Sequence, residues 1–380
     1  MKIRNNIYVY AFLGNIFLDR TVWLTYLQSN SYTLLSIGVL QSILTFAMFA
    51  FELPSGIIAD YFSPKITIIL GHTFIILYLI SMLFCQYFSV LMFGFFCYGI
   101  GLAMISGSDQ TVVHSIDSHK QYISKIGIFN AICILSIAFS SFFGGILSNF
   151  SWRIIFISEI LVQLVCIIYI SSLKITTSVN NSSPSLNTMK KHFYISIKNK
   201  KILKLVFLLA IFEGTFSCIF NFSQALFNHL EFSPFLTSLT LSFAFLFSSV
   251  AGFSINKVVR HLGKEKLIIV FVIISILIHS LYLLEYTLLS VLLYFTSKYT
   301  FEIIDTSLNA SIHEAVNDQI RTSIISFANT LTALVMFLES ILFGYLFSSF
   351  NFLAVYSMIG IIVSAIILLL TVFMPRQRAQ

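Results

Sequence analysis

Apolar runs of about twenty residues or more follow one another along almost the whole chain, separated by short polar turns. A helix needs roughly 20 mostly apolar residues to cross the hydrocarbon core of a bilayer. Twelve segments meet this requirement, and each is a predicted transmembrane helix. They lie near residues 7–28, 34–60, 65–86, 90–112, 121–148, 152–173, 203–228, 234–257, 265–285, 287–313, 321–348 and 351–374.

Composition excludes a soluble globular protein. Hydrophobic residues make up 58% of the chain and charged residues only 10%, whereas about 25% of the residues of a soluble domain are charged. The five cysteines lie in apolar runs without metal-ligand spacing, so we expect no disulfide framework, no metal and no cofactor. Lys2 and Arg4 precede an apolar stretch as in a signal peptide, but this stretch contains Asp19 and Arg20 and is interpreted as the first span. We expect an all-α polytopic membrane protein.

Basic residues predict the orientation. Only Arg20, Arg153 and Lys298 lie outside the N-terminus, the even-numbered loops and the C-terminus. Cytoplasmic loops are enriched in Lys and Arg, so both termini are predicted to be cytoplasmic. We expect a multi-pass protein of a bacterial cell membrane.

One polar segment divides the spans six against six. Residues 175–202 are rich in Ser and Asn and end in a lysine cluster. We expect an N-terminal six-helix bundle over 1–174, a cytoplasmic linker over 175–202 and a C-terminal six-helix bundle over 203–380. The lysines either contact anionic lipid or only fix the topology, and we favour the second interpretation.

An internal repeat relates the two halves. Four residue pairs near predicted helix ends share an offset of 196: Gly56 with Gly252, Asp60 with Asn256, Asp109 with Asp305, and Lys125 with Arg321. Such a duplication usually places a binding site between two repeats of a transporter. The offset pairs Asp19 with Thr215 and Glu213 with Phe17, so these two carboxyl groups inside predicted spans do not follow the repeat.

The loop at residues 56–65, GIIADYFSPK, resembles the signature of the major facilitator superfamily. ELPSG at 52–56, SGSD at 106–109 and the pattern formed by Asn309, Arg321, Thr322 and Ser326 are similar to a bacterial branch of that superfamily associated with efflux. The resemblance covers essentially the whole chain. It implies two six-helix repeats, alternating access and a cavity lined by spans one, four, seven and ten, and we expect a monomer.

The resemblance also implies a conformational latch of Gly56, Asp60, Lys65, Asp109 and Arg321. A carboxylate at a helix end can accept hydrogen bonds from the N-terminus of another helix. The partner of Asp60 would be the eleventh span, which starts near Arg321. The alternative is that Asp60 and Lys65 only set topology and turn geometry. Ser63-Pro64 and a single Lys65 depart from the more basic, Gly-containing loop of the family.

Polar residues recur at helical spacing inside three predicted spans. They are Tyr8, Asn15, Asp19 and Tyr26 in the first, Glu213, Ser217, Asn221, Gln224 and Asn228 in the seventh, and Lys298, Glu302, Asp305, Asn309 and His313 in the tenth. Such a stripe must face protein or water rather than lipid. The candidate substrate and proton ligands are Asp19, Arg20, Glu213, Asn221, Gln224, Lys298, Glu302, Asp305 and Asn309.

Two carboxyl groups are the first candidates for carrying a proton. Glu213 has no basic neighbour in sequence and would be protonated readily when desolvated. Asp19 is a proton-carrying or cation-recognising candidate, with an ion pair to Lys298 as the alternative. Adjacent helical positions point about 100° apart, so Asp19 and Arg20 are predicted to have different partners.

The other embedded acids have simpler interpretations. Glu302 is expected to be neutralised by Lys298, four residues away. Asp305 is either a ligand or a helix-end residue. Glu159 and Glu339 are expected to make interhelical hydrogen bonds.

The fifth span contains residues that bear on the direction of transport. Drug-extruding members of the family typically carry G-x3-G-P-x2-G-G there, and this chain has Ser136, Ser140, Ser141, Gly144 and Gly145 instead. The small residues predict close helix packing. Because the proline and two of the glycines of the exporter motif are replaced, the fifth span gives only weak support for export.

These features favour a secondary transporter that exports small hydrophobic or cationic molecules in exchange for protons. Its expected partners are a small-molecule substrate, protons and membrane lipids, and no nucleic acid. No phosphate-binding loop is present, so ATP is not the direct energy source. The alternatives are proton-coupled uptake of a nutrient or peptide, an intramembrane enzyme and a sensor. The enzyme is disfavoured because His313-Glu314 lacks the second histidine of a zinc motif.

Overall fold

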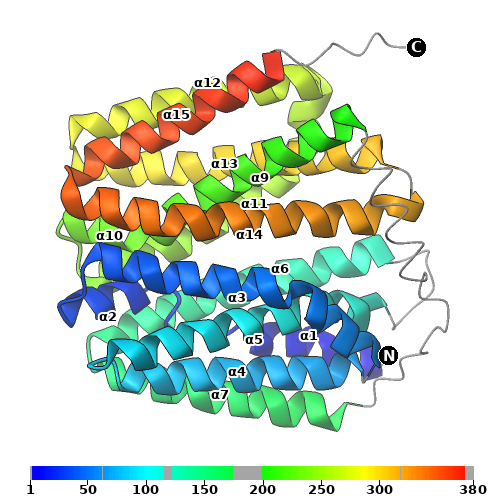
Figure 1. Ribbon diagram of the computed structural model, residues 1–380, viewed down its shortest axis with the longest axis vertical. Coiled ribbons are helices and arrows are strands. Elements are labelled where there is room, and N and C mark those ends of the chain that lie inside the picture. The colour runs from blue at the N-terminus through cyan, green and yellow to red at the C-terminus, as the bar shows by residue number, and fades with distance from the viewer. Residues whose placement is uncertain (1, 62, 115–121, 174–198, 317, 373–380) are drawn as a thin grey trace. The chain divides into compact units, whose positions relative to one another are not determined.

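Helices provide the regular secondary structure throughout residues 2–61, 63–114, 122–173, 199–316 and 318–372, the part of the chain that this computed structural model describes (Figure 1). The all-α prediction is confirmed. The helices are α1 (Lys2–Gly14), α2 (Trp23–Ser29), α3 (Leu34–Tyr61), α4 (Pro64–Leu83), α5 (Phe88–His114), α6 (Tyr122–Ser148), α7 (Trp152–Ser172), α9 (Lys200–Asn221), α10 (Ser223–His229), α11 (Pro234–Leu262), α12 (Lys264–Leu281), the 3₁₀ helix η1 (Tyr282–Leu284), α13 (Thr287–Ala315), α14 (Asp318–Ser349) and α15 (Phe352–Val372).

Ten of the described helices are long and apolar enough to cross a membrane. Two of the twelve predicted spans are not among them. The tenth predicted span is α13, a helix of 29 residues with several charged side chains. The first predicted span is not one helix, because it is broken between α1 and α2. The described structure is therefore consistent with twelve crossing segments, of which the first is interrupted over residues 15–22 and the seventh at Phe222.

Side chains fix where several helices begin. Ser63 accepts a hydrogen bond from the backbone N–H of Ile66 at 3.2 Å, and Pro64 occupies the first helical position of α4. A proline is favoured there because its missing N–H would have no partner in any case. Thr33 and Ser233 cap α3 and α11 in the same way, through hydrogen bonds of 3.2 Å from residues three positions later.

The two halves repeat at an offset of 200 residues. α2 and α10 start at Trp23 and Ser223, α4 and α12 at Pro64 and Lys264, and α7 and α15 at Trp152 and Phe352. Ser31 and Glu231, in matching turns, share positive φ angles of 67° and 62°. The predicted offset of 196 is thus wrong by four residues. A shift of about one helical turn keeps a residue on the same helix face, so short motifs can be aligned in the wrong register.

The corrected offset changes which residues correspond. Asp60 falls on Arg260 rather than Asn256, and Asp19 falls on Ile219 rather than Thr215. Glu213 falls on Leu13, so neither Asp19 nor Glu213 has an ionisable counterpart at the corrected offset. The break in the first span is not repeated at equal length either, since a single residue separates α9 from α10.

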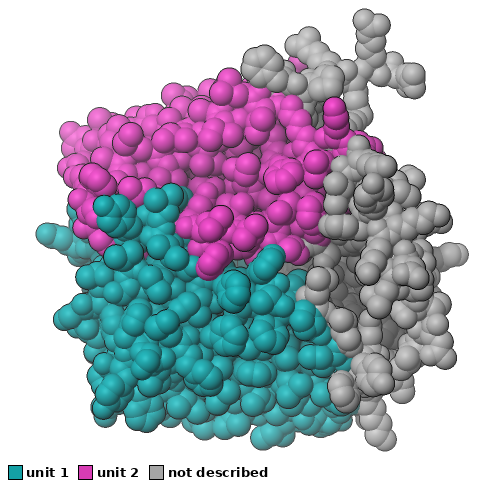
Figure 2. Space-filling view, in the orientation of Figure 1, with its two compact units in different colours: residues 1–182, 224–246, 340–345 teal, residues 183–223, 247–339, 346–380 magenta. Residues whose placement is uncertain are grey.

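The chain forms two compact units (Figure 2). Unit 1 contains residues 1–182, 224–246 and 340–345, and unit 2 contains 183–223, 247–339 and 346–380. Short segments of the second half thus pack within unit 1. The division into two six-helix bundles at 1–174 and 203–380 stays a prediction, and residues 174–198 of the expected linker lie outside the described residues.

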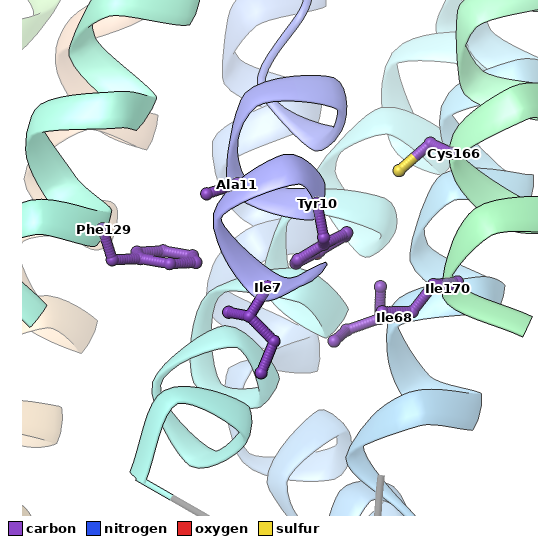
Figure 3. Close-up of a cluster of buried hydrophobic side chains, with 7 residues drawn as sticks. All are labelled: Ile7, Tyr10, Ala11, Ile68, Phe129, Cys166 and Ile170. Carbon is purple, nitrogen blue, oxygen red and sulfur yellow. The ribbon is translucent and has the colours of Figure 1, made fainter. Parts of the chain in front are cut away.

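In unit 1, α4 packs against α3, α5 and α7 (Figure 1). The short helix α1 adds its apolar face to this group. Figure 3 shows Ile7 and Tyr10 of α1 beside Phe129 of α6, Ile68 of α4 and Ile170 of α7. Burying such side chains among neighbouring helices holds α1 in place although it is too short to cross a bilayer alone.

In unit 2, α12 packs against α13 and α15, and α9 packs against the same two helices. Aromatic rings fill the contact between α9 and α13. The rings of Phe212 and Phe301 are stacked with centroids 5.4 Å apart, and Phe220 meets Phe301 edge-on at 5.3 Å. These contacts place the polar residues of the two helices on neighbouring faces.

Candidate functional site

The first span is interrupted over residues 15–22, between α1 and α2. Only turn-like backbone hydrogen bonds remain there, such as Arg20 N to Phe17 O at 3.4 Å and Val22 N to Asp19 O at 2.8 Å. The predicted stripe of Tyr8, Asn15, Asp19 and Tyr26 along one continuous helix face is therefore wrong. Asn15 and Asp19 lie outside regular helix, so helical spacing does not determine where their side chains point.

Side chains of other helices hydrogen-bond to the carbonyls that the break releases. Ser136 of α6 donates to Phe12 O at 2.6 Å, and Gln163 of α7 donates to Ile16 O at 3.3 Å. A backbone polar group inside a bilayer needs such a partner because no water replaces it. The break is therefore stabilised by polar residues that are distant in sequence.

Gln224 of α10 closes the other side of the break. Its side-chain oxygen accepts hydrogen bonds from the backbone N–H groups of Leu24 at 2.9 Å and Thr25 at 3.3 Å, and its amide nitrogen donates to Arg20 O at 3.0 Å. These are N–H groups of the first turn of α2, which have no partner within the helix. One turn later in α10, Asn228 contacts the hydroxyl of Thr25 at 3.1 Å. Gln224, predicted as a substrate ligand, thus serves here as a cap for α2.

Two glycines let α6 approach its neighbours closely. A side chain at Gly144 would collide with the backbone oxygen of Leu18 in the break, and one at Gly145 would collide with Ser238 of α11. The close packing predicted from the small residues of the fifth span is confirmed at these positions. Without a Cβ at Gly144, the broken segment lies directly on α6.

Asp19 lies at the centre of the break and is 1% exposed. Tyr78 of α4 donates its hydroxyl hydrogen to Asp19 Oδ2 at 2.6 Å, and the backbone N–H of Asp19 donates to Glu159 Oε2 of α7 at 2.9 Å. Arg20 is exposed, with its guanidinium carbon 5.9 Å from the centroid of the Phe245 ring. The prediction that Asp19 and Arg20 have different partners is confirmed.

A second set of buried polar groups continues along α7. Gln163, one turn after Glu159, lies 2.6 Å from Nδ1 of His72 on α4, and the sulfur of Cys166 lies 3.5 Å from the other ring nitrogen. Glu159, Gln163 and His72 are each fully buried. Together they form a polar seam between α4 and α7.

The second group of candidate ligands lies in unit 2, on α9 and α13. The carboxyl groups of Glu213, Glu302 and Asp305 lie near enough for their charges to interact. Lys298 interacts electrostatically with Glu302, as its spacing predicted, and its Nζ lies 3.5 Å from the centroid of the Phe220 ring. The structure thus brings the predicted acids and Lys298 together on one face, next to aromatic rings.

Asn309 and Asp305 interact within α13. The amide nitrogen of Asn309 donates to Oδ2 of Asp305 at 3.1 Å, whereas Oδ1 of Asp305 is buried without a hydrogen-bond partner. Asp305 lies well inside α13, which ends at Ala315, so it is not a helix-end residue. Asn221 is the last residue of α9, beside the single-residue gap before α10.

Glu339 of α14 contacts α9 at Thr215. It accepts a hydrogen bond from the Thr215 hydroxyl at 2.8 Å. The interhelical hydrogen bonds expected for Glu159 and Glu339 are therefore present.

The latch residues are only partly described. Gly56 and Asp60 lie in α3, Asp109 in α5 and Arg321 in α14, but their side chains lie outside the described part of the structure. Lys65 donates to the backbone oxygens of Ser171 and Leu173 at 2.5 and 2.9 Å, at the end of α7. A lysine there satisfies carbonyls that have no partner within the helix. The latch stays a prediction.

Sequence reasoning missed Glu159 and Tyr78 as partners of Asp19. A signal for Glu159 was present, because Glu159, Gln163 and Cys166 recur at helical spacing on α7 and so lie on one face. Tyr78 gave no such signal, since a lone tyrosine in an apolar run is common. No group of three or more His, Cys, Asp or Glu side chains that could hold a metal occurs among the described residues.

Comparisons with known proteins agree on one family. A family model described as Major Facilitator Superfamily matches residues 7–338. The Bacillus subtilis (strain 168) protein named "Uncharacterized MFS-type transporter YxaM" is 25% identical over 220 residues, which are 56% of this chain and 55% of that protein. The chain thus matches about half the length of this curated relative.

Solved structures share the fold along nearly the whole chain. A mutant of the nucleoside transporter NupG has a TM-score of 0.83 at 15% identity, covering 97% of this chain and 98% of that one. A D-xylose-proton symporter has a TM-score of 0.74 at 13% identity, covering 95% and 96%. An inward-facing, unoccupied bacterial homolog of the human lysosomal transporter Spinster has a TM-score of 0.71 at 13% identity, covering 98% and 94%. Identities this low show the fold alone.

Proposed function

Because the chain belongs to the Major Facilitator Superfamily, we propose that it is a secondary active transporter that exports small hydrophobic or cationic molecules in exchange for protons. It is a multi-pass membrane protein with the fold of that family's transporters. The proposed location is the cell membrane, with both termini in the cytoplasm. The proposed partners are a small-molecule substrate, protons and surrounding lipids, and we propose a monomer.

The acidic face of α9 and α13 carries this proposal. Three carboxyl groups, those of Glu213, Glu302 and Asp305, share it with aromatic rings. Ionisable groups inside a membrane are costly and mark substrate or proton pathways. A cationic group already lies on this face, since the ammonium of Lys298 is 3.5 Å from the centroid of the Phe220 ring. A cation is attracted both by such a ring and by nearby carboxylates.

Exchange follows from competition for the same carboxyl groups. A protonated carboxyl holds a cation poorly, and a bound cation disfavours protonation, so each ligand displaces the other. Moving one proton down the membrane potential supplies about 2.3 kcal/mol per 100 mV. This energy drives export when the protein exposes the acidic face to the two sides of the membrane in turn.

Uptake in symport with protons is the second candidate function. Ser136, Ser140 and Ser141 occupy the fifth-span positions where drug exporters of the family carry glycines and a proline. A D-xylose-proton symporter is among the proteins with a similar fold. Under this reading the same carboxyl groups bind the proton together with a polar solute.

Proteoliposomes containing an internal pH-sensitive dye test the coupling. We expect substrate-dependent proton movement with at least one of tetraphenylphosphonium, uridine, D-xylose or a dipeptide. Glu213→Gln should reduce this movement at least tenfold, because it removes a carboxyl group that titrates. Glu285→Gln, the same change at an exposed turn, should leave it unchanged. If Glu213→Gln behaves like Glu285→Gln, Glu213 does not carry the proton.

Everted membrane vesicles separate export from import. An exporter accumulates the probe inside such vesicles when the proton gradient is imposed, and an importer depletes it. If no probe moves in either direction while the reconstituted protein remains folded, the proposed substrate class is wrong. Chemical conversion of a probe without any dependence on the gradient would instead support an enzyme.

A further inference from the structure

The broken segment of the first span is bound at two points by one face of α7. The backbone N–H of Asp19 donates to Glu159 Oε2 at 2.9 Å, and the side-chain nitrogen of Gln163 donates to Ile16 O at 3.3 Å. Glu159 and Gln163 are four residues apart, so they lie on the same helix face. α7 therefore holds residues 16–19 through one backbone donor and one backbone acceptor.

The contact between Gln163 and His72 of α4 allows only one arrangement of hydrogens. A backbone carbonyl can only accept, so the amide nitrogen of Gln163 faces Ile16 O and its oxygen faces His72. Nδ1 of His72 lies 2.6 Å from that amide oxygen and must therefore carry a hydrogen. The carbonyl of Ile16 thus determines which nitrogen of His72 is protonated.

The other ring nitrogen of His72 completes a chain of hydrogen bonds. In a neutral imidazole only one nitrogen carries a hydrogen, so Nε2 is an acceptor. The sulfur of Cys166 lies 3.5 Å from Nε2, and its thiol can donate. His72 is 0% exposed and both of its nitrogens contact uncharged groups, so a charged imidazolium would be buried without a compensating carboxylate. The chain therefore runs in one direction, from Cys166 through His72 and Gln163 to Ile16.

The orientation of the Gln163 amide depends on this histidine. If the amide were turned over, its nitrogen would face the N–H of His72 and its oxygen would face Ile16 O. A donor would then meet a donor and an acceptor an acceptor, in a site where all three side chains of the chain are fully buried. Buried polar groups without a partner are costly. His72 therefore acts on the broken segment through Gln163.

The second repeat lacks both the polar seam and a break at this position. At the offset of 200, the counterparts of the three seam residues are apolar and buried: Val272, Ile359 and Val363. α9 is helical throughout residues 216–219, which correspond to 16–19 of the first span. The equivalent helices pack without polar residues at these positions. The polar seam therefore serves the break rather than the packing of α4 against α7.

We propose that His72 and Gln163 are positioning residues that keep the first span broken and so fix where the half-helix α2 begins. Neutral His72, with its hydrogen on Nδ1, orients the amide of Gln163, and Gln163 holds Ile16 O outside regular helix. The two residues lie on α4 and α7, helices that carry none of the candidate substrate and proton ligands. Their effect on transport rests on the proposed function, whereas their hold on the broken segment does not.

Nitrogen NMR of histidine-labelled protein in lipid tests the state of His72 without any substrate. The signal of His72 is the one that His72→Asn removes, and it should report a neutral ring with the hydrogen on Nδ1. Gln163→Leu removes the acceptor of this hydrogen and should shift the Nδ1 signal. Gln86→Leu, in an exposed turn, should leave the signal unchanged. A wild-type ring that carries its hydrogen on Nε2, or no response to Gln163→Leu, would overturn the proposal.

Two substitutions of His72 separate hydrogen bonding from packing. In His72→Asn the side-chain nitrogen is as many bonds from Cβ as Nδ1 is, so it can donate to Gln163, whereas in His72→Gln the amide lies one atom further out. We expect His72→Asn to keep the wild-type hydrogen exchange over residues 16–22. His72→Gln should exchange about 2- to 12-fold faster, the effect of losing one hydrogen bond. Glutamine fills more of the space of histidine than asparagine does, so packing alone predicts the reverse order, and the reverse order would overturn the proposal.

A double substitution guards against unfolding. His72→Val combined with Gln163→Val introduces the residues of the second repeat, where the equivalent helices pack, so the purified variant should remain monodisperse. Its exchange over residues 16–22 should be faster than that of the wild type, and most of the gradient-driven movement of tetraphenylphosphonium should be lost. Binding of this probe, which we propose for α9 and α13, should be unchanged. A folded double variant with wild-type exchange would overturn the positioning role.

The two proposals fail separately. A wild type that moves no probe would refute the exporter, and the NMR and exchange results would still decide the positioning role. Driven movement in the wild type, together with unchanged exchange in the double variant, would refute the positioning role while retaining transport.

Discussion

At the scale of single residues, Lys298 is the basic side chain that contacts the acidic face of α9 and α13. Its ammonium occupies the space above Phe220, and its charge acts on Glu302. A substrate cation bound to the same ring and carboxyl group would compete with this lysine. The ammonium group of Lys298 would thus occupy the position that a substrate cation takes in the proposed site.

We therefore expect Lys298→Gln to strengthen the binding of tetraphenylphosphonium. Removing the competing cation frees the ring and Glu302, and a cation–π contact contributes about 0.5–2 kcal/mol, which corresponds to about a 2- to 30-fold lower Kd. Equilibrium dialysis on purified protein measures this change. Lys266→Gln, near the start of α12, is the control. Weaker binding in Lys298→Gln would show that Lys298 assists the substrate instead of competing with it.

At the scale of elements, the break between α1 and α2 is held by side chains from α4, α6, α7 and α10. Ser136, Gln163 and Gln224 hydrogen-bond to its backbone, and Gly144 lets it lie on α6. A discontinuous helix inside a membrane persists only where such partners replace the lost backbone bonds. Discontinuous helices commonly accompany binding sites in transporters.

Gln224→Leu should loosen α2 because it removes the acceptor for Leu24 N and Thr25 N and the donor to Arg20 O. Loss of a helix cap costs about 0.5–2 kcal/mol. Amide hydrogen exchange over residues 23–29 should accordingly become about 2- to 30-fold faster. Gln86→Leu, the same change in an exposed turn between α4 and α5, should have no such effect. Unchanged exchange in Gln224→Leu would mean that the cap contributes nothing to α2.

At the scale of the whole molecule, transport requires the protein to alternate between two conformations. The predicted latch places Asp60, near the end of α3, against the N-terminus of α14, which begins at Asp318. A carboxylate at a helix N-terminus contributes about 0.3–2 kcal/mol. Removing it would favour the conformation in which the cytoplasmic ends are separated.

Asp60→Asn should accordingly shift the conformational equilibrium by about 2- to 30-fold without loss of the fold. Distances between spin labels placed at the cytoplasmic ends of α3 and α14 would report the populations. Glu231→Gln, in an exposed turn next to α11, serves as the control. An unchanged distance distribution in Asp60→Asn would leave Asp60 with a role in topology and turn geometry only.

Much of the fold follows from the sequence because the bilayer imposes simple requirements. The helical class and the long apolar helices are visible in the order of residues. The duplication is visible too, but its register is not. Four matched residue pairs gave an offset of 196, whereas the helix bounds give 200. The error is about one helical turn, after which a helix presents nearly the same face.

In the candidate sites, too, some contacts could be predicted from the sequence and others could not. The spacing of Lys298 and Glu302 within one helix was sufficient to predict their interaction, because neighbours at four residues meet in any α-helix. The pairing of Asp19 with Glu159 spans 140 residues, and no local rule indicates it. The sequence by itself determined a helical membrane protein and its polar positions, since hydrophobicity and helical periodicity are local properties. Only the tertiary structure decided that the first span is broken and that its aspartate meets a second acid, because those contacts depend on which distant helices pack together.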